Sequence, residues 1–182
     1  MCFIFPLFGT VVLKMDIPEL VGHSCAIVVG EVVQIDKEFE SIPHTENVQV
    51  LNAILQIRIE KVLKACSSIH EGDVISVKRM GGQIGDLDMR VPGAPTFKSK
   101  RDVLLFLTEL PETGEHVITG FSQGKFRVMR DSKTGEEVAF QDKNARSLAL
   151  VDQKTGREVK SSTPPYINLE DLVNEIKKYV QE

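Results

Sequence analysis

The stretch that decides the fold spans residues 51–64 and reads LNAILQIRIEKVLK. From Leu51 to Ile59 apolar residues alternate with polar ones, with Ile54 as the exception, and this is the period of a strand with one buried face. The alternation changes phase at Lys61, because the two residues that follow it are both apolar. A long strand that changes phase bends between two sheets. We therefore expect residues 51–64 to form one long, bent strand.

A β-branched run precedes it at residues 26–35 and reads AIVVGEVVQI. Gly30 inside this run is typical of a bulge or a sharp bend at the corner of a small barrel. Further short strands, separated by turns rich in glycine and proline, are expected at residues 73–78, 103–107, 116–121 and 125–130. The strand spacing, the glycine and the phase change together predict a mainly all-β fold, an antiparallel OB-like barrel.

The C-terminal third is expected to add a β-hairpin extension and a terminal α-helix. Residues 131–138 and 152–159 share the pattern D-x-K-T-G-x-E-V, which suits a hairpin turn closed by a glycine with positive φ. After a linker at 161–165, Asn168 is expected to cap the helix. The apolar stripe of this helix must be buried on the body of the chain or on a partner. The stripe consists of Leu169, Leu172, Val173, Ile176 and Val180.

The composition is that of a soluble globular protein. The chain has 182 residues, of which 42% are hydrophobic and 26% charged. These values exclude a mainly disordered chain, a collagen and a coiled coil. A formal net charge of −4 argues against nucleic acid as a partner, because such binders need a basic surface. Three cysteines are too few for a disulfide scaffold.

The first fifteen residues are nearly all apolar. Residues 2–13 form a run without a charge. This run is too short for a transmembrane span but has the length of the apolar region of an export signal. No Lys or Arg precedes the run, so a degenerate export signal and a buried first strand bent at Pro6 both remain open. The expected organisation is the apolar segment 1–15, the barrel with its hairpin extension at 16–160, and the linker and helix at 161–182. The first of these readings implies an exported or cell-surface protein, and the second allows a cytoplasmic one.

Motifs of the common enzyme classes are absent. The chain has no P-loop, no G-x-S-x-G, no C-x-x-C and no H-E-x-x-H. We therefore expect no enzyme, no catalytic residue and no cofactor. A zinc site assembled from His23, Cys25 and a distant Cys66 or His70 is the alternative to isolated histidines at turns and small apolar cysteines, and we favour the latter. Cys25 and Cys66 each flank a strand and could form a disulfide in an exported protein.

Residues 81–97 form an unusual loop with four glycines and two prolines. A loop of this length inside a compact domain is usually functional or disordered, and its apolar residues argue against disorder. Asp86 and Asp88, with Gln83, resemble a loose calcium or anion loop. They lack the spacing of an EF-hand, so a tight turn with solvated carboxylates is the favoured interpretation, and no metal is expected.

The order of these elements resembles a family of uncharacterised small all-β domains from bacterial and archaeal genomes. The most specific matches are residues 81–85 (GGQIG), 89–97 (MRVPGAPTF) and 123–126 (QGKF). Members usually follow an export signal, and some are joined to metalloprotease-type domains. More distantly, the chain resembles the OB-fold of netrin and tissue-metalloprotease-inhibitor modules. The resemblance covers about residues 16–138. It implies no catalytic residue, and without the cysteine-rich edge of the inhibitors it does not imply protease inhibition.

The expected function is a non-catalytic binding or interaction module whose ligand is an unknown protein or small molecule. The contact surface is expected on the barrel loops. It comprises Gln83, Asp86, Asp88, Arg90, Gln123 and Lys125. Two alternatives remain: an exported envelope or structural component that docks through its C-terminal helix, and a metal-dependent hydrolase with ligands scattered in the sequence.

Overall fold

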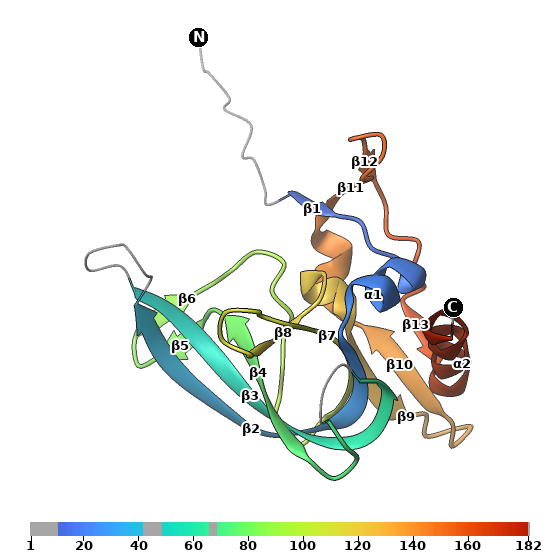
Figure 1. Cartoon of the computed structure of the whole chain (residues 1–182), viewed down its shortest axis with the longest axis horizontal. Coiled ribbons are helices and arrows are strands. Elements are labelled where there is room, and N and C mark those ends of the chain that lie inside the picture. Colours follow the sequence, from blue (N-terminus) through green and yellow to red (C-terminus); the bar gives the residue numbers. More distant parts are fainter. Residues whose placement is uncertain (1–10, 42–48, 66–68, 182) are drawn as a thin grey trace.

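The structure is a computed structural model that describes residues 11–41, 49–65 and 69–181. Within these residues five strands of the largest sheet form a ring (Figure 1). They are β2 (Ala26–Ser41), β3 (Gln49–Lys64), β4 (Val74–Met80), β8 (His116–Ile118) and β7 (Asp102–Glu109). Neighbouring strands run antiparallel except β4 and β8, which are parallel. The predicted mainly β fold is confirmed, whereas an OB-like barrel stays a prediction.

The bends expected in the two long strands are present. Register shifts between β2 and β3 leave Glu60 and Leu63 without a residue opposite them, one on each side of Lys61. The shift at Glu60 falls between Val29 and Gly30, and a Cβ atom at Gly30 would collide with the carbonyl oxygen of Arg58. Since only glycine fits this close approach of two backbones, Gly30 allows β2 to bend over β3.

The ring encloses an apolar cluster to which all of its strands contribute. β3 alternates between this interior and the outside, as the period of two requires. The buried members are Ala26, Val28, Val32, Leu55, Ile57, Ile59, Ile69, Val77, Val103, Leu105 and Leu107. Cys25 and Ile118 pack at its margin, so the interior of the ring reaches the start of β2 and the strand β8.

A second core lies on the outer side of β2 and β7. There β9 (Lys125–Arg130), β10 (Glu137–Gln141) and β13 (Tyr166–Asn168) extend the sheet, and the helices α1 (Ile17–His23) and α2 (Leu169–Val180) cover it (Figure 1). Asn168 caps α2 as expected, accepting hydrogen bonds from two backbone N–H groups of the first turn. Leu169, Leu172, Val173 and Ile176 are buried in this core. The apolar stripe of the helix is thus covered by the body of the chain.

The predicted hairpin tips are confirmed. One joins β9 to β10, and the other joins β11 (Ala149–Val151) to β12 (Glu158–Val159). Gly135 and Gly156 at these tips have φ of 75° and 64°. Within the apolar segment 1–15, β1 (Val11–Leu13) pairs in parallel with β11, but Val11 and Leu13 are 59% and 46% exposed. Residues 1–10, including the expected bend at Pro6, lie outside the described residues.

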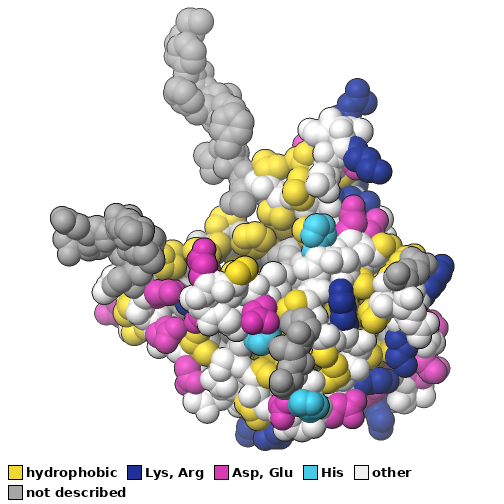
Figure 2. Space-filling model, viewed as in Figure 1, with side chains coloured by type: hydrophobic (Ala, Val, Ile, Leu, Met, Phe, Trp, Pro, Cys, Tyr) yellow, Lys and Arg dark blue, Asp and Glu magenta, His cyan; other side chains and the backbone are white. Residues whose placement is uncertain are grey.

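The long loop 81–97 contains a small hairpin that the sequence patterns did not predict. Its strands are β5 (Gly82–Ile84) and β6 (Leu87–Met89), beside the ends of β2 and β3 (Figure 1). The short 3₁₀ helices η1 (Phe121–Gly124) and η2 (Lys143–Ser147) complete the described elements. Figure 2 shows several acidic side chains on the side of this hairpin, and basic and acidic side chains mixed on the side of β9 and β10. None of the helices in the described part of the chain is long and apolar enough to cross a membrane.

Candidate functional site

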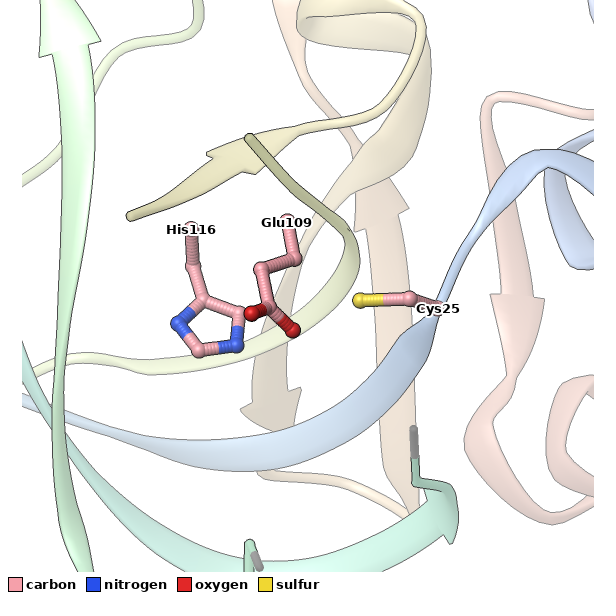
Figure 3. A group of neighbouring side chains, drawn as sticks. All are labelled: Cys25, Glu109 and His116. Atoms are coloured by element: carbon pink, nitrogen blue, oxygen red, sulfur yellow. The ribbon is translucent and has the colours of Figure 1, made fainter. Parts of the chain in front are cut away.

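Cys25, Glu109 and His116 meet where the start of β2, the end of β7 and the start of β8 come together (Figure 3). One potential ligand atom of each residue lies within 4.8 Å of those of the other two. Glu109 and His116 are directly opposite each other in the β7–β8 pair. The backbone N–H of Cys25 donates to the carbonyl oxygen of Leu107 at 2.8 Å. Strand pairing therefore holds the backbone of all three residues.

These side chains stand at the margin of the apolar interior of the ring. All three are half-buried, and His116 pairs across the sheet with the fully buried Val77. Figure 3 shows the carboxylate of Glu109 between the imidazole of His116 and the sulfur of Cys25. Nε2 of His116 is buried and makes no hydrogen bond with any residue that the structure describes. A buried nitrogen of this kind costs about 1–3 kcal/mol when it has no partner.

The set of donors matches zinc chemistry. A thiolate, an imidazole and a carboxylate are the three side-chain groups that bind Zn²⁺ in proteins. Three protein ligands leave the fourth tetrahedral position to water or to a substrate, as in open zinc sites. The arrangement can hold a transition metal, and such a metal would lower the pKa of a bound water molecule.

The zinc ligands considered from the sequence are only partly brought together. Cys25 is in the cluster, whereas His23 and His70 are exposed, and His70 lies 3.5 Å from Asp73. Cys66 lies outside the described residues, and so does the predicted Cys25–Cys66 disulfide. Sequence reasoning missed Glu109 and His116. Their one signal was that they flank the turn at residues 111–115, which makes them neighbours across a hairpin.

Four of the six predicted contact residues are exposed and adjacent. Gln83, Asp86 and Asp88 belong to the β5–β6 hairpin, and Arg90 follows it. Nε of Arg90 lies 2.7 Å from a carboxylate oxygen of Asp88, and the amide of Gln83 donates to the carbonyl oxygen of Gly85. The carboxylate of Asp88 is therefore bound by a neighbouring residue of the same loop, as is common for Asp in turns.

The other two predicted contact residues, Gln123 and Lys125, are not on the surface. Only 1% of Gln123 and 5% of Lys125 is exposed, so both residues lie beneath the surface on which they were expected. The side-chain amide of Gln123 accepts from the N–H of Met15 and donates to the carbonyl oxygen of Leu13, both at 2.9 Å. Gln123 thus fastens the segment after β1 to the body of the chain.

Lys125 forms a buried ion pair with Asp142. Their charged atoms are 2.9 Å apart, and the two side chains are 7% and 1% exposed. The same carboxylate accepts hydrogen bonds from the N–H and hydroxyl of Thr96 and from the N–H of Asn144. The ammonium group lies 5.3 Å from the ring centre of Phe97. The pair therefore ties the loop 81–97 to η2.

The electrostatics of Asp142 follow from these contacts. Burial alone raises the pKa of its carboxyl group, but the charge of Lys125 and the hydrogen bonds from Asn144, Lys125 and Thr96 outweigh it and hold the pKa below its ordinary value. Burial lowers the pKa of the nearby Arg79, whose guanidinium donates to the carbonyl oxygens of Gly81 and Pro95. Arg79 thereby secures both ends of the same loop.

A groove of about 690 Å³ runs between this loop and η2. Its charged lining residues are Arg79, Arg90, Lys143 and Asp88, which leaves an excess of positive charge. The apolar part of the lining consists of Met89, Val91, Pro92, Ala94, Leu148 and Ala149. The groove can therefore accept an anionic group beside an apolar one.

No protein-family model matches this chain, and no curated protein is similar enough to be counted as a relative. The resemblance to netrin-type modules stays a prediction from the sequence.

Proposed function

We propose that this chain is a non-catalytic binding module and that its ligand occupies the groove between loop 81–97 and η2. The observation that carries the proposal is the lining of the groove, which combines three cationic side chains with one carboxylate and several apolar residues. Asp88 already pairs with Arg90. The ligand class that fits is a small molecule with a carboxylate or phosphate group attached to an apolar body.

The wall of the groove is held in place before any ligand arrives. Asp142 binds Thr96 on the loop, and the amide of Asn144 donates to the carbonyl oxygen of Ala94 at 2.8 Å. Arg79 adds its two hydrogen bonds to the loop backbone. A wall that is ordered in the free protein loses less conformational entropy on binding, which favours recognition of small ligands.

The test is a titration of the isotope-labelled chain with phenyl phosphate, followed by nuclear magnetic resonance. We expect shifts of backbone amides at residues 88–96 and 143–149, and none with phenol, which lacks the charge. Lys143→Ala and Arg90→Ala should each weaken binding about tenfold, the effect of losing one charge-assisted contact. Lys133→Ala, at the tip of the β9–β10 hairpin, is the matched control. Shifts elsewhere, or none, would refute the groove as the site.

We further propose that the five-strand ring is an OB-like barrel and that the protein is exported. The closed order of the strands and the bends at Gly30 and Lys61 support the first proposal. The uncharged run at residues 2–13 supports the second. The mass of the mature N-terminus from the native source tests export, because cleavage near Met15 or Asp16 supports it and an intact apolar start contradicts it.

The two alternative functions have unequal support. Docking of a partner through α2 would need Leu172 and Ile176, which are 1% and 0% exposed, to leave the second core. A metal-dependent hydrolase with scattered ligands finds three such ligands in Cys25, Glu109 and His116. Metal binding at that cluster does not depend on the groove, because the two share no residue.

A further inference from the structure

We propose that Cys25, Glu109 and His116 form a binding site for Zn²⁺ or a similar divalent transition metal. This goes beyond the proposed function, since the cluster is built on β2, β7 and β8 and shares no residue with the groove. One ligand atom of each residue lies within 4.8 Å of those of the other two. Pairing of β7 with β8 holds Glu109 and His116, and a backbone hydrogen bond to Leu107 holds Cys25. In a tetrahedral zinc site neighbouring ligand atoms are about 3.5 Å apart, so small side-chain rotations bring them into range.

The donor chemistry selects the class of metal. One sulfur, one nitrogen and one carboxylate suit Zn²⁺ and its borderline-soft neighbours, whereas Ca²⁺ and Mg²⁺ require several oxygen ligands. Glu115, which immediately precedes β8, has its carboxylate 2.9 Å from Nζ of Lys78, and the same Nζ lies 2.7 Å from the carboxylate of Glu40. Glu115 therefore binds Lys78. Glu109 is the carboxylate that faces the thiol and the imidazole (Figure 3).

A second observation points to a ligand independently of the clustering. Nε2 of His116 is shielded from solvent and has no hydrogen-bond partner in the described part of the chain. Buried polar atoms are nearly always satisfied by protein, water or an ion. A metal bound through Nε2 satisfies this nitrogen and replaces the missing hydrogen bond.

The experiment uses the full chain, reduced and stripped of metal with a chelator. Zn²⁺ is titrated against a chromophoric chelator, and Co²⁺ is added separately as a spectroscopic probe. We expect one Zn²⁺ per chain and, with Co²⁺, an absorption band from thiolate-to-metal charge transfer. Cys25→Ser and His116→Gln should each weaken Zn²⁺ binding at least about 100-fold, and Cys25→Ser should abolish the band. Glu109→Gln should weaken binding while leaving the band in place.

Two controls keep the outcome decisive. His70→Gln removes an exposed histidine and should leave Zn²⁺ affinity unchanged. Circular dichroism of every variant without metal verifies folding, and if Cys25→Ser fails to fold, Glu109→Gln and His116→Gln carry the test. The proposal is overturned if the reduced chain binds no Zn²⁺, if the Co²⁺ band survives Cys25→Ser, or if His70→Gln weakens binding as much as His116→Gln does. Binding of phenyl phosphate is measured without metal, so either proposal can fail alone.

Discussion

At the scale of single residues, Lys125 and Asp142 form the most buried ion pair in the part of the chain that the structure describes. Their side chains are 7% and 1% exposed. The carboxylate of Asp142 also binds Thr96 and so fastens the loop 81–97 to η2. Removing one member of such a pair leaves the other charge buried and uncompensated, whereas removing both does not. The two kinds of substitution should therefore differ in their effect on stability.

Lys125→Met should lower the free energy of unfolding by about 3–5 kcal/mol, because Asp142 then keeps a buried charge without its cation. Adding Asp142→Asn to this variant should restore part of the loss, since the amide is neutral and can still accept from Asn144. Urea denaturation measures both. Arg58→Met is the control, because its pair with Glu31 is exposed and should contribute at most about 1 kcal/mol. A double variant less stable than Lys125→Met would contradict the ion-pair account.

The pH dependence of stability should also reflect Asp142. The pKa of its carboxyl group is lowered in the folded chain, so the charged form stabilises the fold above the unfolded value of about 4. This stabilisation should be lost as the pH falls below about 4 toward the folded pKa. Denaturation at a series of pH values should show a steeper acid loss in the unchanged chain than in Asp142→Asn. Parallel curves would mean that other carboxylates dominate.

At the scale of elements, the bend of β2 over β3 depends on close contact between two backbones. A Cβ atom at Gly30 would collide with the carbonyl of Arg58, so the strand cannot keep its position with any other residue. Gly30→Ala should therefore destabilise the chain by about 1–3 kcal/mol. Gly22→Ala is a matched control, because a Cβ atom there meets nothing within 4 Å and Ala favours the helix α1. Thermal unfolding of the two variants should move in opposite directions.

The helix α2 is an integral part of the second core. Leu172 is 1% exposed, and Leu172→Ala should lower the free energy of unfolding by about 2–5 kcal/mol. Lys177→Ala on the exposed side should change it by less than about 0.5 kcal/mol. Chemical denaturation compares them. If both changes were neutral, the helix would be detached in solution, and docking to a partner through its stripe would become the better account.

For the whole molecule, the sequence predicted what local patterns determine. The phase change at Lys61 and the cap at Asn168 each depend on a few neighbouring residues, and the structure has both. Gly30 indicated a bend from its residue type alone, although the backbone that requires a glycine there belongs to Arg58 on the next strand. The alternation in β9 could not show that Lys125 is buried, because Arg127 on the same face of the strand is exposed. Lys125 alone on that face lies against Phe97 and Asp142. Alternation of apolar and polar residues shows which residues share a face of a strand, but it does not show what covers each face.

The cluster of Cys25, Glu109 and His116 lay beyond such reasoning for a related reason. It depends on the order in which distant strands pair, since Cys25 meets the other two only because β2 lies beside β7. No spacing in the sequence encodes that order. The groove likewise depends on a contact between distant segments, because Asp142 binds loop 81–97 next to η2. The sequence patterns around Asp142 predicted only a hairpin extension.

The shortest strand of the ring has a consequence for solvent access. β8 has three residues, and it pairs with β4 only through Val77 with His116 and Lys78 with Val117. Segments held by few hydrogen bonds open locally at a small fraction of the free energy of global unfolding. In deuterium exchange the amide hydrogens of β8 should therefore exchange faster than those of β2 and β7, whereas equal protection would contradict this. Faster exchange there would identify β8 as the strand along which water first reaches the apolar interior of the ring.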